Sequence, residues 1–517
     1  MRFAIIGAGV AGLTTAKVLL QAGHDVQVFD KAPDVGGVWS RTRRYPGLCT
    51  QSPKAQYSLS DFPMPKDFPE WPSGEQVQQY LAAYADEFKV TPHVRLETEV
   101  LSAVPDGDRW RLEVRDLAGG ETSGLIFDRL VVANGIFCEP FVPQFPGVEE
   151  FRSAGGRLIA GCELHDVEEA RDRSVLVVGY GKSACDVTVP VSEVAASTDV
   201  IARQLLWKVP RKIGGVVNFK MLLLTRMGEA LFRYIRLRGF ERFLHGPGNR
   251  VRRNMLNSVG SASRRQFHLD ELGLVPPGTM EDIVKGAIGL ATEGFFEGVR
   301  AGTIRVHHDA RIIRLLVRDG LPSAELSDGT VLPADLVVCS TGFTQGVPFL
   351  PAEVRRTLLD ERDNFLLYRQ ILPLSVPGLY FNGYNSSFFS PLNAELAAVW
   401  ITAHAAGLTA VPEPEELRRQ VAEQLAFMDV AVAGHHCHGG KIIPFSLHNV
   451  DEVLADLDLQ IGRFTRASHW LNPVDPAAYR KVTPRLLDRL AAGSVVAPSP
   501  ATPPDADQDP VPTHQVG

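Results

Sequence analysis

Two glycine-rich fingerprints constrain the fold of this 517-residue chain more than any other feature. One has the spacing Gly-x-Gly-x-x-Gly over Gly7–Gly12, and the other has the spacing Gly-x-Gly-x-x-Ala over Gly179–Ala184. Each follows a short apolar run and precedes a stretch with helical periodicity, which is the order of elements in a dinucleotide-binding βαβ unit. Two such units predict that two dinucleotides meet in this chain, so that a hydride can pass between them.

The first fingerprint lies between an expected strand over residues 2–6 and an expected helix over residues 13–21. Gly7 permits the tight turn, Gly9 lets the backbone approach a pyrophosphate, and Gly12 lets the helix pack closely on the strand. The helix would direct its free N–H groups and its positive dipole end toward the phosphates.

An acidic residue ends the next expected strand, which covers residues 25–29. Asp30 stands about where a ribose hydroxyl needs an acceptor. The pair of glycines after it allows close approach of the backbone, and the Trp after them can cover a flat ring system. Together with the three fingerprint glycines, the residues expected to bind the first dinucleotide are Asp30, Lys31, Gly37, Val38 and Trp39.

The second fingerprint differs from the first in the residue that ends its next strand. Gly179 and Gly181 again provide the turn and the close approach, and Ala184 is an accepted variant at the third position. Arg203, not an acid, ends the strand expected over residues 200–202. Because an arginine can bind a 2′-phosphate that an acid would repel, this residue favours NADPH over NADH. The alternative is that Arg203 is a solvated surface charge.

Composition and charge exclude several classes of protein. The chain is 45% apolar and long enough for two or three domains. Its net charge of −7 argues against nucleic acid as a partner. The six cysteines never form a CxxC pair, which suits a reducing cytosol. With no apolar run near the length of a membrane span and a strand expected from residue 2, we expect a cytoplasmic protein without a signal peptide.

The first binding site has a family resemblance. An acid, a short spacer and Gly-Gly-x-Trp resemble the FAD-binding signature of class B flavoprotein monooxygenases, which are the flavin-containing monooxygenases and the Baeyer–Villiger monooxygenases. The second fingerprint is similar to the Gly-x-Gly-x-Ser-x-x-Asp pattern of the flavin-containing monooxygenases, whereas Baeyer–Villiger enzymes more often have Gln in place of the Asp. The NADPH-binding residues that this resemblance implies are Gly179, Gly181, Lys182, Ser183, Asp186 and Arg203.

A segment after the first site also resembles the flavin-containing monooxygenases. Gln51 occupies the position of the family's Asn, which touches the oxygen-loaded flavin. Glutamine keeps the amide donor and acceptor on a longer arm, so we expect Gln51 to be the catalytic residue in a pocket of altered geometry. The nearby segment Tyr45–Gly47 resembles the Baeyer–Villiger enzymes instead. The residues that match the family's Thr-Asn-x-Pro-Lys…Asp-Phe-Pro pattern are Thr50, Pro53, Lys54, Asp61, Phe62 and Pro63. The resemblance implies that Thr50 contacts a cofactor.

The identifying motif of the class, Phe-x-Gly-x-x-x-His followed by an aromatic residue, is partly present. Gly161 and His165 match, whereas Ile159 replaces the Phe and Glu169 stands where the aromatic residue is expected. The resemblance implies that His165 helps to hold NADP and to link the domains. The alternative is a loop histidine bonded to the backbone.

The expected fold is α/β, with two Rossmann-like dinucleotide-binding domains for FAD and NADPH, the second inserted in the first, and a helical insert. Two matching strand segments mark the points where the chain passes between the two domains. One ends near Asn134 and the other near Thr341 and Gly342, and a long helix begins at Asn393. We expect these four residues to contact the cofactors. The expected boundaries are residues 1–155 and 341–490 for the FAD-binding domain, 156–340 for the NADPH-binding domain, about 205–295 for the insert and 491–517 for a disordered tail.

The resemblance implies an oxygenase. NADPH would reduce FAD, O2 would form a C4a-hydroperoxide, and the distal oxygen would pass to an amine nitrogen or a sulfide sulfur of a small-molecule substrate. Three alternatives stay open: Baeyer–Villiger oxidation of a ketone, which needs a nearby cation such as Arg; an FAD/NADPH reductase; and a dinucleotide-binding sensor. A homodimer also stays open.

A basic region and a histidine-rich run each have two possible interpretations. The region Arg203–Arg265 contains 15 Lys and Arg residues but only two acids, Glu229 and Glu241. Apolar residues interleave with them at helical spacing, which predicts either a peripheral membrane helix pair or a packed substrate lid, and we favour the lid. The run His435–His438 is contiguous and lacks the spacing of a metal site, so we expect a loop and no metal.

Overall fold

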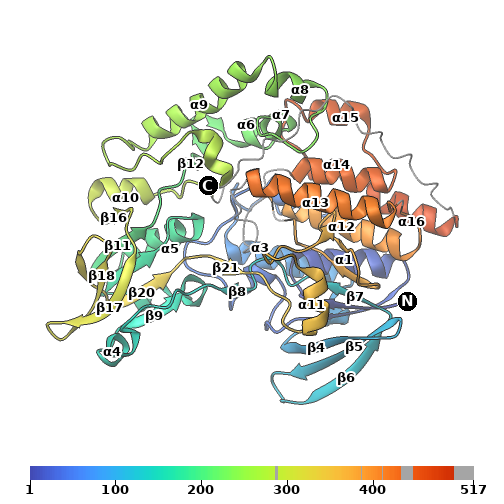
Figure 1. The fold of residues 1–517 in the computed structure, drawn as a ribbon, viewed down its shortest axis with the longest axis horizontal. Coiled ribbons are helices and arrows are strands. Elements are labelled where there is room, and N and C mark those ends of the chain that lie inside the picture. The colour runs from blue at the N-terminus through green and yellow to red at the C-terminus, as the bar shows by residue number, and fades with distance from the viewer. Residues whose placement is uncertain (286–288, 386, 410, 432–445, 494–517) are drawn as a thin grey trace.

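The computed structural model describes residues 1–285, 289–385, 387–409, 411–431 and 446–493 (Figure 1). A five-stranded sheet in which all neighbouring strands run parallel forms the first half, in the order β24-β7-β1-β2-β3. These strands are β1 (Arg2–Ile6), β2 (Asp25–Phe29), β3 (Val94–Arg95), β7 (Arg129–Val132) and β24 (Leu379–Phe381). The strands β1 and β2 have the predicted bounds, and β24 returns to this sheet from far along the chain.

Two helices cover the first sheet. α1 (Val10–Gln21) begins directly after Gly9, three residues earlier than predicted, because the fingerprint's last residues already form its first turn. α12 (Ser390–Ala405) packs along α1 and is apolar nearly all round, which is typical of a buried helix. It also begins three residues before the predicted Asn393, since Pro391 is tolerated in the first turn of a helix.

A second parallel sheet forms the other half, in the order β16-β11-β10-β20-β9. Its central strand β10 is followed by the second fingerprint and by the helix α5, and the edge strand β9 is a strand that the sequence pattern did not predict. These elements are β9 (Arg157–Ala160), β10 (Ser174–Val178), α5 (Lys182–Ser192), β11 (Ser197–Ala202), β16 (Arg305–His308) and β20 (Leu336–Cys339). The two sheets confirm the α/β class with two Rossmann-like units.

Each half carries an antiparallel three-stranded sheet, and a short two-stranded sheet joins the two crossings between the halves (Figure 1). The first three-stranded sheet contains β4 (Thr98–Asp106), β5 (Arg109–Asp116) and β6 (Thr122–Phe127), and the second contains β17 (Ile312–Arg318), β18 (Leu321–Leu326) and β19 (Val331–Pro333). At the crossings, β8 (Glu139–Pro140) pairs with β21 (Phe343–Thr344). After these crossings, β22 (Leu367–Tyr368) pairs with β23 (Leu372–Pro373).

The insert lies between β11 and β16, and its helices cross the top of the molecule (Figure 1). It is not purely helical, because short strands flank the helices. Its elements are β12 (Lys208–Val209), β13 (Lys212–Ile213), β14 (Val217–Asn218), α6 (Lys220–Leu223), α7 (Arg226–Ala230), α8 (Phe240–His245), α9 (Asn249–Gln266), the 3-10 helix η5 (Met280–Lys285), β15 (Gly289–Leu290) and α10 (Phe295–Ala301).

The insert docks on helices near the C-terminus through buried charges. The two acids of its basic region both bind one histidine of α14: Glu229 Oε1 lies 2.5 Å from His448 Nδ1, and Glu241 Oε1 lies 2.8 Å from His448 Nε2. Arg226 donates two hydrogen bonds of 2.6 and 2.8 Å to the Asp451 carboxylate. The other helices are α2 (Lys54–Tyr57), α3 (Gly74–Glu87), α4 (Val148–Ser153), α11 (Ala352–Leu358), α13 (Pro414–Ala431), α14 (Ser446–Asp456), α15 (Arg463–Ser468) and α16 (Val482–Ala491).

Candidate active site

A cavity of about 790 Å³ is lined by residues of both fingerprint regions. It therefore joins the carboxyl ends of the two central strands, where ligands bind in open parallel sheets. The predicted site residues that line it are Gly7, Gly9, Asp30, Lys31, Gly37, Val38, Trp39, Gln51, Asn134, Lys182, Ser183 and Asp186.

The first glycine loop has no room for side chains. Gly7 has a φ of +111°, and a Cβ atom there would lie 2.4 Å from the Ala133 carbonyl oxygen. A Cβ on Gly12 would lie 1.8 Å from the Gly7 carbonyl oxygen, and one on Gly37 would lie 3.1 Å from the Gly9 Cα. The loop thus brings bare backbone to the cavity, as a pyrophosphate-binding loop requires.

Asp30 is held at the carboxyl end of β2 by the backbone. The N–H groups of Ala8 and Ala32 donate hydrogen bonds of 2.7 and 2.9 Å to its two carboxylate oxygens. Burial raises the pKa of this carboxyl group, and the two backbone bonds oppose that shift. The carboxylate is oriented before any ligand arrives, and it lines the cavity beside the glycine loop.

The second glycine loop packs differently. A Cβ on Gly179 would lie 2.6 Å from the Ser340 carbonyl oxygen, whereas a Cβ on Gly181 would meet no atom within 4 Å. Neither glycine lines the cavity. Arg203 follows β11, the strand next to β10, and is exposed, with no ion-pair partner among the residues described.

A buried lysine that sequence reasoning missed supports this loop. Lys208 Nζ donates a 2.7 Å hydrogen bond to the Tyr180 carbonyl oxygen and lies 4.5 Å from the centre of the Tyr180 ring. The only signal in the sequence is a lysine within the apolar run Leu205–Val209, which does not reveal the partner.

The two dinucleotide-binding units meet at the segment Tyr45–Gly47. The Tyr45 hydroxyl donates a 2.8 Å hydrogen bond to Ser183 Oγ, and burial raises the pKa of this hydroxyl. A Cβ on Gly47 would lie 2.3 Å from the Asp186 carbonyl oxygen. The side chain of Asp186 pairs with Lys182 and accepts a 2.6 Å hydrogen bond from Thr292 Oγ1.

Gln51 lies in the cavity, and its amide is held by the insert. Its Oε1 accepts a 3.3 Å hydrogen bond from the Leu290 N–H group in β15. Its neighbour Ser52 donates a 2.6 Å hydrogen bond from Oγ to the Phe388 carbonyl oxygen. Thr50 is buried and does not line the cavity.

Four other predicted residues lie at the junctions around the cavity and do not line it. His165 Nδ1 lies 3.2 Å from the Arg44 carbonyl oxygen, so the ring is bonded to the backbone of the first unit. Thr341 donates to the Phe141 carbonyl oxygen, and the Gly342 carbonyl oxygen accepts a 2.9 Å bond from the Phe141 N–H group.

Asn393 is directed into its own helix start. Its Nδ2 donates to the Phe389 carbonyl oxygen at 3.1 Å, while Ser390 and Ala394 of the same helix line the cavity. Asn134, in contrast, lines the cavity and links the turn after β7 to the returning chain. It accepts a 2.9 Å bond from the Tyr384 hydroxyl and donates a 2.8 Å bond to the Gly346 carbonyl oxygen.

The part of the chain that the structure describes contains neither a metal-binding cluster nor a membrane-spanning helix. No group of three or more His, Cys, Asp or Glu side chains there could hold a metal ion. The run His435–His438 and nearly all of the expected tail lie outside the described residues. None of the described helices is long and apolar enough to cross a membrane.

Known proteins resemble this chain in sequence. The family described as flavin-binding monooxygenase-like matches residues 1–243. A dimethylaniline monooxygenase [N-oxide-forming] 4 from Oryctolagus cuniculus is 28% identical over 445 residues, which are 82% of this chain and 74% of that protein. Flavin-containing monooxygenase 1 from Sus scrofa is 25% identical over 390 residues, with 72% and 67% of the two chains covered.

Solved structures share the fold. The S-allyl-L-cysteine S-oxygenase from Allium sativum superposes with a TM-score of 0.60 at 20% identity and covers 95% of this chain and 97% of its own. The cyclohexanone monooxygenase from Rhodococcus sp. Phi1 bound to NADP⁺ has a TM-score of 0.62 at 17% identity, with 89% and 98% covered. At these identities the likeness concerns the fold alone.

Proposed function

We propose that this chain is a member of the flavin-binding monooxygenase-like family, which its sequence resembles. On that premise it transfers one oxygen atom from O2 to an amine nitrogen or sulfide sulfur of a small organic substrate, with NADPH as reductant. It is a flavin monooxygenase, and its substrates include O2. The observation that carries the proposal is one cavity lined by both fingerprint regions, with Gln51 in its wall.

The residues around the first loop fit FAD. Gly7, Gly9 and Gly37 leave bare backbone for the pyrophosphate, and the oriented Asp30 carboxylate suits a ribose hydroxyl. When bound, FAD supplies the activation of O2 and NADPH supplies the hydride. Trp39, whose Nε1 donates a 3.2 Å hydrogen bond to the Tyr57 hydroxyl, is a fixed apolar wall that helps to exclude water.

The residues around the second loop fit NADPH. The open space at Gly181 leaves room for a pyrophosphate, and the exposed Arg203 is free to pair with a 2′-phosphate. Lys182 is neutralised by Asp186, so Lys208 is the buried positive charge that supports this loop. His165 would help to keep the two units together through its bond to the Arg44 carbonyl oxygen.

The charges in the cavity favour nitrogen or sulfur over a ketone. The basic residues that line it are Lys31, Arg43 and Lys182. Lys182 pairs with Asp186, and Arg43 donates to the Phe137 carbonyl oxygen. Lys31 Nζ lies 3.5 Å from Glu139 Oε1, so all three have partners within the described structure. A ketone would need a free cation beside the reacting oxygen. Baeyer–Villiger oxidation is the second candidate, because the fold of the cyclohexanone monooxygenases matches nearly the whole chain.

The test supplies the FAD-loaded protein with NADPH, isotopically labelled O2 and, in turn, a thioether, a tertiary amine and a cyclic ketone. We expect one labelled oxygen in a sulfoxide or N-oxide for each NADPH consumed. A labelled lactone from the ketone would instead establish the second candidate. Stoichiometric hydrogen peroxide with no oxygenated product from any of the three would contradict both.

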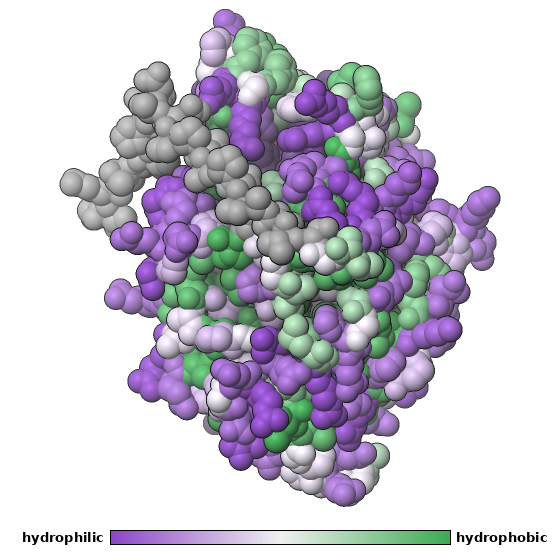
Figure 2. Space-filling model, turned by 90° about the vertical axis from the view of Figure 1, so that its right-hand side faces the viewer, coloured by the Kyte–Doolittle hydropathy of each residue, from purple (hydrophilic) through white to green (hydrophobic). Residues whose placement is uncertain are grey.

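We also propose that the insert is a packed lid, because Glu229, Glu241 and Arg226 are buried against α14. Membrane contact by its outer face is the second candidate. Figure 2 shows apolar side chains among polar ones at the top of the molecule, the level of α8 and α15 in Figure 1. Phe464 of α15 is 95% exposed, and Phe243 of α8 is 47% exposed. Flotation with anionic liposomes tests this contact, and light scattering tests for a homodimer.

A further inference from the structure

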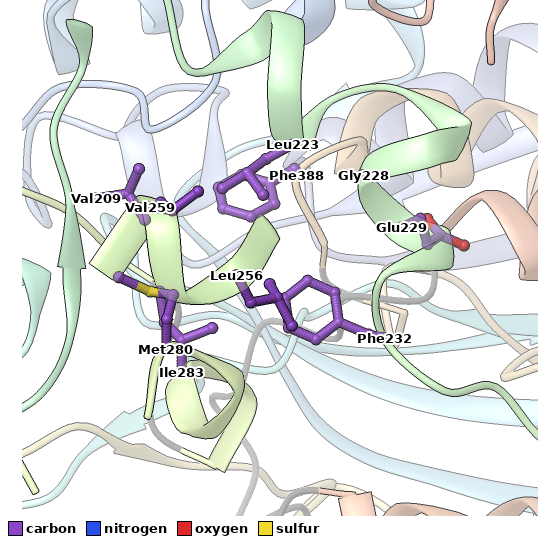
Figure 3. A pocket seen from close by; sticks show the side chains of 10 residues that line it. All are labelled: Val209, Leu223, Gly228, Glu229, Phe232, Leu256, Val259, Met280, Ile283 and Phe388. Atoms are coloured by element: carbon purple, nitrogen blue, oxygen red, sulfur yellow. The ribbon is translucent and has the colours of Figure 1, made fainter. Parts of the chain in front are cut away.

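A second, small cavity lies between elements of the insert and the loop before α12 (Figure 3). Its volume is about 30 Å³. The residues that line it come from β12, α6, α7, the turn after α7, α9, η5 and the loop before α12: Val209, Leu223, Gly228, Glu229, Phe232, Leu256, Val259, Met280, Ile283 and Phe388.

The walls of this cavity offer no free polar group to a ligand. Glu229 is the charged residue among them, and Figure 3 shows its carboxylate directed away from the other side chains. Both carboxylate oxygens are already occupied, by the Leu447 N–H group at 2.9 Å and by His448 Nδ1 at 2.5 Å. All the other lining side chains are aliphatic, aromatic or methionine, so a charged or hydrogen-bonding group would be buried there without a partner.

Phe388 separates the small cavity from the large one, because it lines both. The Ser52 hydroxyl donates to the Phe388 carbonyl oxygen at 2.6 Å, so the backbone that carries this ring is bonded to the residue next to Gln51. On the other side, Val209 of the small cavity pairs in register with Leu290, whose N–H group donates to Gln51 Oε1. Two independent backbone connections therefore place the apolar cavity directly behind Gln51.

We infer that this cavity is the subsite for the apolar substituent of the substrate, and that it selects amines or sulfides carrying an unbranched alkyl chain, with Phe388 as the residue that sets the chain length. The inference rests on the proposed function. The volume holds roughly one or two methylene groups. Met280, which is unbranched and adaptable, and the Phe388 ring would move to admit more. A branched or charged substituent would not enter.

The test uses methyl n-alkyl sulfides from ethyl to hexyl with the FAD-loaded enzyme. For the native protein, the KM for the sulfide should fall about fourfold for each of the first methylene groups that enter the cavity. Val259→Phe on α9 fills the cavity and should abolish this dependence on chain length. Val251→Phe on the same helix is the matched control, because Val251 is exposed, and it should retain the dependence.

A second variant and a binding measurement make the outcome independent of folding and of turnover. Phe388→Ala joins the two cavities and should move the best substrate to a longer chain. Methyl n-alkyl ethers, which have no oxidisable sulfur, should bind to the native enzyme with the same chain-length trend by calorimetry. The inference is overturned if Val259→Phe keeps the trend while retaining FAD. If the ethers show the trend but no sulfide is oxygenated, the proposed function fails and the subsite stands.

Discussion

The buried ammonium group of Lys208 donates a 2.7 Å hydrogen bond to the carbonyl oxygen of Tyr180, the middle residue of the second glycine loop. The same ammonium lies over the Tyr180 ring, 4.5 Å from its centre. This pair ties the loop to β12 of the insert and puts a positive charge next to the expected phosphate position. We therefore expect the binding of NADPH and the attachment of the insert to be coupled through this side chain.

Lys208→Met should weaken NADPH binding. A hydrogen bond to a charged group contributes about 1.5–3 kcal/mol, so we expect the KM for NADPH to rise by about tenfold or more. The FAD content should stay normal, because the first loop is not touched. Steady-state kinetics check this, with Lys212→Met as the control on the exposed face of β13. An unchanged KM for NADPH in Lys208→Met would contradict a role of Lys208 in NADPH binding.

Arg203→Gln should alter the choice between the two nicotinamide cofactors. If Arg203 pairs with the 2′-phosphate, its loss raises the KM for NADPH by about tenfold and leaves the KM for NADH unchanged. The ratio of kcat/KM for the two cofactors is the measurement. A ratio equal to that of the native protein would mean that Arg203 is a solvated surface charge.

Gln51→Ala should uncouple NADPH consumption from oxygen transfer. The variant removes the amide that β15 orients in the cavity, so we expect about a hundredfold fall in the coupled rate, the lower end of the range for loss of one positioned donor. More hydrogen peroxide should form per NADPH. Gln51→Asn keeps an amide on a shorter arm, so its peroxide yield should lie between those of the native protein and Gln51→Ala. Equal peroxide yields in all three proteins would exclude a role for this amide.

Glu395 should make stability depend on pH. Burial raises its pKa to about 7 from an ordinary value near 4.5, while Ser60 donates hydrogen bonds of 2.7 and 3.1 Å to its carboxylate. Because the folded protein favours the protonated form, the contribution of Glu395 to stability is complete below pH 4.5 and is lost as the pH rises through 7. Glu395→Gln stays neutral and should escape this fall.

The expected difference between native protein and Glu395→Gln grows by about 3 kcal/mol from pH 4.5 to pH 8, in favour of the variant. Urea unfolding at the two pH values measures it. Glu415→Gln, at an exposed position, is the control. A constant difference across this range would show that Glu395 is ionised in the folded state.

His448 should make stability fall in the same direction, but at higher pH. Burial alone would lower its pKa, but the carboxylates of Glu229 and Glu241 outweigh burial and raise the pKa to about 10. With an ordinary value near 6.5, its contribution is complete below pH 6.5 and is lost as the pH rises through 10. His448→Gln should cost about 3–5 kcal/mol at pH 6.5, because two buried carboxylates lose their cation.

The cost of His448→Gln should shrink toward pH 10. Urea unfolding followed by tryptophan fluorescence measures this, and protease cleavage within the insert reports its release from α14. His308→Gln is a suitable control, because that histidine is exposed and lies in the second sheet. A pH-independent cost would show that His448 is neutral between the two acids.

Much of the two βαβ units could be predicted from short stretches of sequence. The strands β1 and β2, the turn at Gly7 and the acid at residue 30 were predicted within a residue, because a buried strand and a glycine turn depend on neighbouring residues. The start of α12 was wrong by three residues, since Pro391 and the polar loop before it look like a break in the sequence yet form the first turn of the helix.

Local sequence patterns therefore specify the binding units, their order along the chain and whether an acidic or a basic residue ends the second strand of each unit. Only the packing of the folded chain brings particular residues into one cavity. Tyr45 reaches Ser183 across the domain junction, and Gln51 meets Leu290 although 239 residues separate them. Such contacts depend on how two sheets and an insert pack together. No periodicity along the chain encodes that packing, because it arises from apolar burial summed over distant segments.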